Sequence, residues 1–457
     1  KGVTDEGKSV LAHDDQLTED INNKAYGTDG NTAQDQRALS DAQMNSTNTL
    51  YDALGPVLGK YYKDAADAGK LPKTAQFLSD MNKSASTGVA KATYQHPRPY
   101  VDRVNFNGTT LNMNGLKQTL NIKKVPGYEN FDWGDGEAPD NEYDGLYNSG
   151  SFPSGHTTFA FTQGAGLAYL LPELGPEIMT RVSEAGNNRI VLGVHYPLDI
   201  MGGHIAGQYG VATAVSGEKT AQEGAAARAE LVDYLTAQCK ADNHGDTLDA
   251  CITNTGANAA NGYRNDFTDE VSTKPVTDRA SALAAYKARM TYGFQATGTT
   301  GQAPVVPDSA VRMFDNVAAF KSLDSAQKKA VLAATEGDSG YPLDASSQGW
   351  ARVNLAAAYS AKVTLSADGK NVVKVEPGQA QASVVRETSG SNGNNGGNGN
   401  GGSNAGNTGV NNASGRNPSG TQPLSKTGAD VSGIASAFIL IAAAGVTITM
   451  IRRKHAI

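Results

Sequence analysis

The chain has 457 residues, enough for one large or two ordinary domains, which excludes a peptide-sized module. Its 39 lysines and arginines against 46 aspartates and glutamates give a net charge of −7, which leaves no overall positive charge for a nucleic-acid backbone and argues against a nucleic-acid partner. Two cysteines exclude both a disulfide-scaffolded mini-protein and a zinc or iron–sulfur site built from cysteines.

The first part of the chain is a polar segment followed by helices. Residues 1–43 are polar and weakly periodic, so no element is assigned to them, and wrapping around the body or disorder both stay open. Apolar residues recur at three- and four-residue steps over 44–68 and over 74–94, which predicts two helices with one buried face each. Pro56 is expected to kink the first of these helices.

A long loop follows the second helix. Residues 105–150 are rich in Gly, Asn and Asp, which predicts an ordered excursion without regular structure. Six carboxylates fall within 131–144, but their spacing does not fit an EF-hand, so we favour a solvated loop at the site entrance over a calcium site. Trp133 and Tyr143 are candidates to line that entrance.

The remaining body is predicted to be helical. Segments 159–171 and 200–214 are apolar almost all round, as expected for helices in the middle of a bundle. Periodicity predicts further helices at 224–240, 279–294, 311–334 and 351–361. Residues 363–375 alternate around Asp368-Gly369, which indicates a small β-hairpin. We therefore predict a mainly α fold, with a catalytic helical core over 44–217 and a helical part over 218–380 that completes the same body.

The C-terminal end has the pattern of a surface anchor. Residues 381–423 are rich in Gly, Asn and Ser, which predicts a flexible linker. Residues 432–451 are an uncharged apolar run long enough to span a bilayer as a helix. Arg452, Arg453 and Lys454 follow directly, which places the tail in the cytoplasm and the body outside the cell.

Between linker and apolar run, the sequence Leu424-Ser425-Lys426-Thr427-Gly428 resembles the Leu-Pro-X-Thr-Gly signal of Gram-positive sortase substrates, with Ser425 in place of proline. The resemblance implies that a sortase cleaves between Thr427 and Gly428 and attaches Thr427 to the peptidoglycan of the cell wall. A plain single-pass anchor is the alternative. The chain starts at Lys1 without a leader, which is what removal of a secretory signal would leave.

An extracellular setting bears on the two cysteines. Cys239 and Cys251 lie close together in the sequence, and an oxidising compartment favours a disulfide between them. We expect this disulfide to be structural, the alternative being a pair of free thiols.

Three short segments hold most of the residues suited to chemistry. In the first, Lys91 lies in the last turn of a predicted helix, and the prolines on either side of Arg98 force it into an extended conformation, so both cations can point to one place. In the second, Ser154-Gly155-His156 opens an apolar helix, where free N–H groups and the helix dipole favour an anion. In the third, Asp199 is spaced to reach an imidazole nitrogen of His195.

Each segment also has an ordinary interpretation when it is taken singly. Lys91 and Arg98 fit solvated surface charges, and Ser154 fits a helix cap. His195 and Asp199 fit a structural hydrogen-bonded pair.

The joint order of the segments favours the catalytic interpretation. Lys-X6-Arg-Pro, Pro-Ser-Gly-His and Arg-X5-His-X3-Asp together resemble the three-part signature of the type 2 phosphatidic acid phosphatase superfamily. One secondary position departs, because Asn188 stands where the family usually has Ser. The resemblance implies a helical bundle of the acid phosphatase and vanadium haloperoxidase type.

The resemblance also implies the role of each residue. His195 is the nucleophile, and Asp199 fixes its tautomer and stabilises the phosphohistidine. His156 protonates the leaving group and then activates water. Two histidines that need opposite charge states predict a bell-shaped, acid-shifted pH profile. The phosphoryl group is held without a metal by Lys91, Arg98, Ser154, Gly155 and Arg189.

The leading interpretation is a secreted, wall-anchored acid phosphatase similar to the bacterial class A enzymes, acting on soluble phosphate monoesters without a cofactor. A lipid or polymer phosphate as substrate stays open as a variant. A vanadium haloperoxidase that holds vanadate in the same pocket, and a surface adhesin on a degenerate enzyme scaffold, are alternatives from other classes. No role is assigned to the other histidines examined, which are left as structural or surface residues: His13, His96, His204 and His244.

Overall fold

The structure is a computed structural model that describes residues 5–43, 46–106, 109–110, 115–130, 141–255, 262–344 and 348–388. The predicted apolar span 432–451, the sorting signal 424–428 and most of the predicted linker 381–423 lie outside the described residues. The described chain up to Glu387 forms one compact unit. Within the described residues, no helix has both the length and the apolar character needed to cross a membrane.

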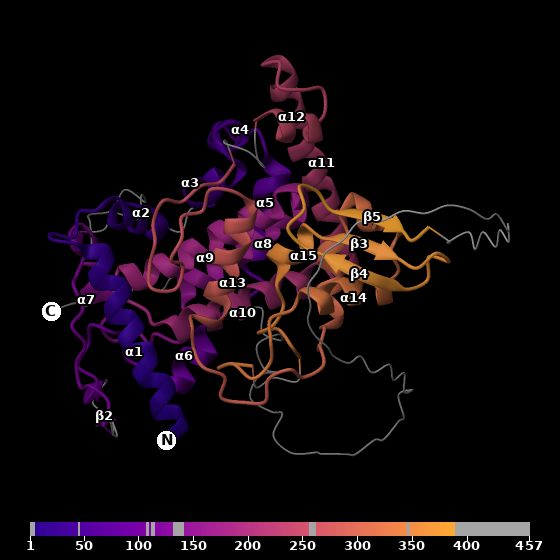
Figure 1. The fold of residues 1–457 in the computed structure, drawn as a ribbon. Coiled ribbons are helices and arrows are strands. Elements are labelled where there is room, and N and C mark those ends of the chain that lie inside the picture. Colours follow the sequence, from indigo (N-terminus) through magenta and orange to yellow (C-terminus); the bar gives the residue numbers. More distant parts are fainter. Residues whose placement is uncertain are drawn as a thin grey trace, which may run out of the picture. The chain divides into compact units, whose positions relative to one another are not determined.

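The unit is mainly helical, as the sequence predicts (Figure 1). Its α-helices are α1 (Asp5–Tyr26), α2 (Ala33–Ala42), α3 (Ser46–Leu50), α4 (Pro56–Asp67), α5 (Pro72–Asn82), α6 (Gly88–Tyr94), α7 (Glu142–Leu146), α8 (Gly155–Leu170), α9 (Gly175–Val191), α10 (Pro197–Ala214), α11 (Glu218–Ala241), α12 (Leu248–Thr255), α13 (Arg279–Thr291), α14 (Ser325–Thr335) and α15 (Leu355–Tyr359). Short 3₁₀ helices are η1 (Tyr51–Leu54), η2 (Tyr128–Asn130), η3 (Pro172–Leu174), η4 (Asp308–Phe314) and η5 (Ala318–Ser322). The strands are β1 (Asn105–Phe106), β2 (Thr109–Thr110), β3 (Lys362–Leu365), β4 (Val372–Glu376) and β5 (Ser383–Arg386).

Helix α8 is the centre of the packing that positions the site. It is apolar on all sides because α5, α9 and α10 pack around it. Small residues on α10 allow a close approach, since a Cβ added at Gly203 would lie only 2.9 Å from the carbonyl oxygen of Ser154. The backbone N–H of Ser154 also donates to the carbonyl of Asp199 at 3.0 Å. These contacts bring the N-terminal end of α8 beside the first turns of α10.

The N-terminal segment 1–43, to which no element was assigned, forms helices α1 and α2. Leu17 and Ile21 pack into a second hydrophobic core with residues of α9 and α10. Polar side chains of the same helix are also buried, and Asp14 accepts a hydrogen bond from the backbone N–H of Leu198 at 3.0 Å. The apolar periodicity is therefore weak because part of the inward face is polar.

Three predicted helices are interrupted. Segment 44–68 is broken rather than kinked, because η1 ends at Gly55 with φ of 82° and Pro56 begins α4, where its missing N–H costs nothing. Segment 74–94 divides into α5 and α6, and segment 311–334 divides into η4, η5 and α14. Apolar periodicity continued through these turns and concealed the breaks.

The C-terminal strands form a small sheet. The predicted hairpin over 363–375 is present as the antiparallel pair β3–β4, in which Val363 lies opposite Val375. Strand β5, which was not predicted, adds in parallel on the other side of β3, giving the order β4-β3-β5. Val363 and Leu365 of the central strand are buried in the main hydrophobic core.

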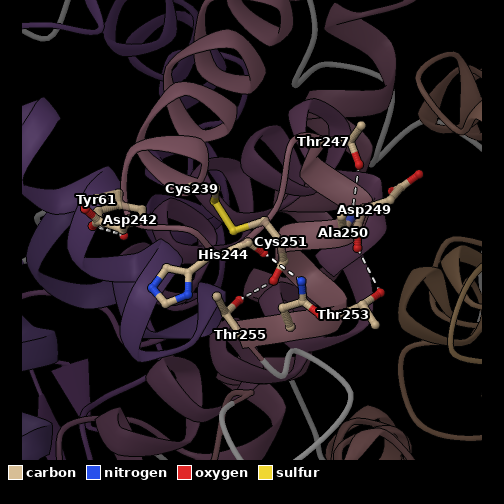
Figure 2. Close-up of a disulfide and its surroundings, with 11 residues drawn as sticks. Tyr61, Cys239, Asp242, His244, Thr247, Asp249, Ala250, Cys251, Thr253 and Thr255 are labelled. Atoms are coloured by element: carbon tan, nitrogen blue, oxygen red, sulfur yellow. Dashed lines mark hydrogen bonds between the residues drawn. A yellow bond between two sulfur atoms is a disulfide. The ribbon is translucent and has the colours of Figure 1, made fainter.

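Cys239 and Cys251 form the predicted disulfide, which joins the end of α11 to α12 (Figure 2). Both cysteines are fully buried. The turn between the two helices is held further by the side-chain amide of Asn254, which donates to the carbonyl of His244 at 2.9 Å. Helix α12 was not predicted, and besides this link its Leu248 and Ile252 pack in the main hydrophobic core.

We expect replacement of both cysteines by serine to loosen α12 locally. A crosslink over a separation of 12 residues contributes about 3 kcal/mol, which corresponds to roughly 100-fold in an opening equilibrium. Hydrogen exchange of the α12 amides should therefore be faster by about that factor, while the amides of α8 keep their protection. Equal acceleration in both helices would contradict a local role.

Candidate active site

The three sequence segments meet in one place. Lys91 at the end of α6 donates to the backbone carbonyls of Gly150 and Ser151, which lie just before α8. Arg98, on the extended stretch after α6, donates from Nη1 to the carbonyl of Val194 at 3.0 Å. The structure therefore brings both cations to the junction between the start of α8 and the start of α10.

His195 and Asp199 form a buried pair at the start of α10. The Asp199 Oδ2 atom lies 3.0 Å from His195 Nδ1 and accepts a second hydrogen bond from the backbone N–H of Tyr196 at 2.9 Å. Because the carboxylate accepts, Nδ1 carries the hydrogen and Nε2 keeps its lone pair. Arg98 Nη1 lies 3.0 Å from Nε2 and donates to that lone pair.

The charges around His195 favour its neutral form. Burial lowers the pKa of the imidazole well below its ordinary value, and the nearby charges of Arg98, Lys91 and Arg189 lower it further. Burial raises the pKa of Asp199, an effect that the Tyr196 N–H and the cations oppose. A neutral imidazole whose Nε2 carries no hydrogen is the state that a nucleophile needs.

The other cations of the site are also desolvated. The guanidinium of Arg98 is buried, and its Nε donates to the carbonyl of Ser149 at 3.1 Å. Burial, together with the charges of Arg98 and Arg189, lowers the pKa of Lys91 to about 8. A bound anion would offset this mutual repulsion.

Among the described residues, Arg189 has fewer hydrogen-bond partners than Lys91 or Arg98. It lies in the last turn of α9, is 1% exposed, and donates from Nη2 to the hydroxyl of Tyr128 at 2.8 Å. Its Nε and Nη1 atoms have no hydrogen-bond partner among the described residues. Because buried N–H groups without partners are costly, this guanidinium is suited to an anionic ligand.

The start of α8 contributes backbone donors and a second histidine. Ser154 caps the helix by accepting a hydrogen bond from the backbone N–H of Thr157 at 3.2 Å, and Gly155 is the first helical residue. His156 is partly buried, with Nε2 3.2 Å from the carbonyl oxygen of Ala42 on α2. Burial and the charges of Arg189 and Arg98 lower the pKa of His156 well below its ordinary value.

Two residues that the sequence interpretation left out support Asp199. Ser151 donates to Asp199 Oδ1 at 3.3 Å, and the Nδ1 of His96 lies 2.9 Å from the Ser151 hydroxyl. The ring of His96 packs against Tyr196 with centroids 4.8 Å apart. His96, which was assigned no role, is therefore part of the network behind the nucleophile. Its place two residues before Arg98, inside the first segment, was the available signal.

The predicted entrance residues fare differently. Tyr143 is fully buried and cannot line an entrance, because its hydroxyl accepts from the N–H of Val125 at 2.8 Å and donates to the carbonyl of Leu192 at 2.8 Å. Trp133 lies outside the described residues.

His204, to which no role was assigned, is buried against Phe161, and its Nε2 lies 2.8 Å from the Tyr286 hydroxyl. In the described part of the chain, no group of three or more His, Cys, Asp or Glu side chains is arranged to hold a metal ion.

Comparisons with known proteins agree with this geometry. Residues 75–221 match the sequence model of the PAP2 superfamily, and they include all three segments. An acid phosphatase of Zymomonas mobilis subsp. mobilis is 33% identical over 205 residues, which cover 44% of this chain and 61% of that protein. A non-specific acid phosphatase of Providencia stuartii is 27% identical over 189 residues, covering 40% of this chain and 61% of that protein. The chain thus spans about three fifths of the length of the curated relatives it matches.

Proposed function

We propose that the protein is a metal-independent phosphatase that hydrolyses phosphate monoesters through a phosphohistidine. One observation carries the proposal: His195 Nε2 carries no hydrogen and accepts from Arg98, with the charges of Lys91 and Arg189 nearby, while Asp199 contacts Nδ1 on the other side of the ring. The names of the two relatives, both acid phosphatases, support this reaction class.

The first step transfers the phosphoryl group to the enzyme. The oxygens of the phosphoryl group take the hydrogen bonds of Lys91, Arg98 and Arg189, together with N–H donors at the start of α8. His195 Nε2, released from Arg98, forms the N–P bond as the P–O bond to the leaving alcohol breaks. His156, as imidazolium, gives its proton to the departing oxygen.

The second step returns the enzyme to its starting state. His156 is now neutral and takes a proton from a water molecule, whose oxygen attacks phosphorus. The N–P bond breaks, the electron pair returns to His195 Nε2, and orthophosphate leaves. Throughout both steps, Asp199 offsets the positive charge that forms on His195.

The proposal is tested with p-nitrophenyl phosphate and the full-length protein. We expect hydrolysis that survives EDTA and is inhibited by vanadate. Hydrolysis that disappears with EDTA would contradict a metal-independent reaction. Halide oxidation that depends on added vanadate and peroxide, without phosphatase activity, would replace the proposal by the haloperoxidase alternative.

His156→Ala should separate the two steps. With p-nitrophenyl phosphate, whose leaving group needs little protonation, the variant can still form the phosphoenzyme but lacks the base that activates water. We expect kcat to fall by about 10²- to 10³-fold, together with a burst of one p-nitrophenolate per enzyme and an accumulated phosphohistidine. Rapid-quench assays measure both quantities. A variant that turns over slowly without a burst would show that His156 acts only in the first step.

The histidine pKa shifts predict an acidic pH optimum. His195 must be neutral, and its lowered pKa moves the acid limb of kcat/KM to lower pH. His156 must be protonated, and its lowered pKa makes it lose that proton earlier as pH rises, so the alkaline limb also moves to lower pH. Both shifts act in the same direction, so the optimum should lie below about pH 6.5, the ordinary histidine pKa. A profile of kcat/KM from about pH 4 to pH 9 measures it with glycerol 2-phosphate, whose poor leaving group needs the acid, and an optimum above neutrality would contradict the assignment.

We also propose that the protein is exported and attached to a Gram-positive cell wall through Thr427. The order of linker, Leu424-to-Gly428 pentapeptide, apolar run and basic tail supports this proposal. Mass spectrometry of the wall-released protein should find Thr427 as its last residue. A Thr427→Ala variant that stays equally fixed to the wall would favour a plain membrane anchor.

A further inference from the structure

We propose that the C-terminal end of α2 positions the general acid of the reaction, with the Ala42 carbonyl holding the Nε2–H of His156 and Asp41 fixing that carbonyl in place. The inference rests on the proposed phosphatase mechanism. It gives a catalytic role to a segment that lies outside the stretch matched by the PAP2 superfamily model.

The contact itself determines which nitrogen of His156 exchanges protons. The Ala42 oxygen lies 3.2 Å from Nε2, and a carbonyl can only accept, so Nε2 carries the hydrogen. Proton exchange with the substrate then takes place at Nδ1. Ala42 is the last residue of α2, where the carbonyls carry the negative end of the helix dipole. This environment favours the imidazolium that the first step requires.

The residue before Ala42 is clamped by helix α9. Arg181 donates from Nη1 to Asp41 Oδ2 at 3.0 Å and from Nη2 to Oδ1 at 2.5 Å. Asn188 donates to the same Oδ2 at 2.7 Å. Asp41 and Arg181 have side chains only 1% and 2% exposed, so the clamp is inside the protein. Helix α9 also carries Arg189 in its last turn. One helix therefore fixes both a cation proposed to bind phosphate and the carbonyl that holds His156.

The other charges near His156 oppose its protonation. Arg189, Arg98 and Lys91 face it as cations, and His195 lies within electrostatic reach. On the far side, Asp41 is the carboxylate next to the Ala42 carbonyl, and the charges beyond it, Asp52 and Glu184, are paired with Arg37 and Arg181. The hydrogen bond to Ala42 raises the pKa of His156 against burial and the three cations. Loosening α2 should therefore make His156 a poorer acid catalyst.

Asp41→Asn tests the clamp, because it weakens the bidentate contact with Arg181 while keeping the size of the side chain. Asn188→Ser is a milder second variant that removes only one hydrogen bond from Asp41, and it decides the question if Asp41→Asn does not fold. Asp35→Asn is the matched control on the same helix. Asp35 is buried at the opposite end of α2, where its carboxylate accepts hydrogen bonds from the backbone N–H and the hydroxyl of Thr32, the N-cap residue. This change therefore weakens the helix without touching its C-terminal end.

The readout is kcat/KM for two substrates, because this quantity covers the steps up to departure of the leaving group. Glycerol 2-phosphate has a poor leaving group that needs the acid, whereas p-nitrophenyl phosphate does not. We expect Asp41→Asn to lower kcat/KM for glycerol 2-phosphate by about 10- to 100-fold and for p-nitrophenyl phosphate by less than about 3-fold. Asn188→Ser should act in the same direction more weakly, and Asp35→Asn should leave the ratio unchanged. Equal losses on both substrates, or the same ratio in Asp35→Asn, would overturn the proposal.

A second measurement does not depend on turnover. Histidine ¹⁵N NMR of the full-length protein with saturating orthophosphate reports the tautomer and titration midpoint of His156, whose signals are identified by their loss in His156→Gln. We expect the Nε2–H tautomer, and a midpoint lowered by at least about half a pH unit in Asp41→Asn. An Nδ1–H tautomer or an unchanged midpoint would overturn the inference. If the wild type hydrolyses neither substrate, the proposed function fails, and the NMR result then shows separately whether α2 sets the tautomer and pKa of His156.

Discussion

His195→Ala should abolish phosphate-ester hydrolysis. Removal of the imidazole leaves the cations and helix donors able to bind a phosphoryl group but leaves nothing to form the N–P bond. We expect kcat for p-nitrophenyl phosphate to fall by about 10⁴-fold or more, as for the loss of a covalent nucleophile in general. Acid-labile, alkali-stable labelling from a ³²P-phosphate ester should be present in the wild type and absent from the variant.

The variant needs a control for folding, because His195 is buried and hydrogen-bonded to Arg98 and Asp199. Orthophosphate binding, measured by calorimetry, should persist in His195→Ala, since it depends on the cations rather than on the nucleophile. His244→Ala, a change beside the disulfide, is the matched histidine replacement and should keep full activity. Label that remained in His195→Ala would assign the phosphoenzyme to another residue.

The sequence indicates the candidate site more directly than it indicates the helices that surround it. Lys91, Arg98, His156, His195 and Asp199 could be assigned because residues of fixed type occur in a fixed order, and each lies at a helix end where a glycine or proline marks the boundary. The N-terminal ends of α8 and α10 lie beside each other and bring these segments together. A motif of this kind encodes chemistry and local geometry at once.

Helices α1, α2 and α9 were missed for a shared physical reason. Each buries polar or charged side chains against the rest of the protein, as Arg181 and Glu184 do on α9, so the apolar period that marks a helix is interrupted. Burial of such groups depends on partners far away in the sequence. Arg181 is paired with Asp41, which lies 140 residues before it, and no local pattern could indicate that contact.

The contacts that hold His156 and His195 in place were missed for a different reason. Ala42 contributes a backbone oxygen 114 residues from His156, and a backbone atom leaves no trace in residue type. Ser151 and His96 do have informative side chains, but Ser151 contacts Asp199 and His96 contacts Ser151, so neither bonds to His195 itself. Sequence reasoning indicated the residues that the proposed mechanism uses and missed the contacts that hold them in place.

Asp199→Asn is the second change for which we expect a large effect. His195 Nδ1 and the N–H of Tyr196 both contact Asp199 Oδ2, so a carboxamide oxygen at this position still accepts from both, and the NH₂ group takes the place of Oδ1 beside the Ser151 hydroxyl. The tautomer of His195 is therefore kept. What the change removes is the negative charge that stabilises the phosphohistidine. We expect kcat to fall by about 10²- to 10³-fold with a KM changed by less than about 3-fold, because the phosphohistidine cation loses its counter-charge.

Ser151→Ala is the matched comparison for this effect, because it removes the partner of the other Asp199 oxygen and leaves the charge and the His195 contact in place. A single hydrogen bond to a charged group is worth about 1.5–3 kcal/mol, so we expect a loss of roughly 10- to 100-fold in kcat. The two variants thus separate orientation of the carboxylate from its presence. If Asp199→Asn lost no more activity than Ser151→Ala, the negative charge of Asp199 would not stabilise the phosphohistidine, and its contact with Nδ1 would serve only to orient the ring.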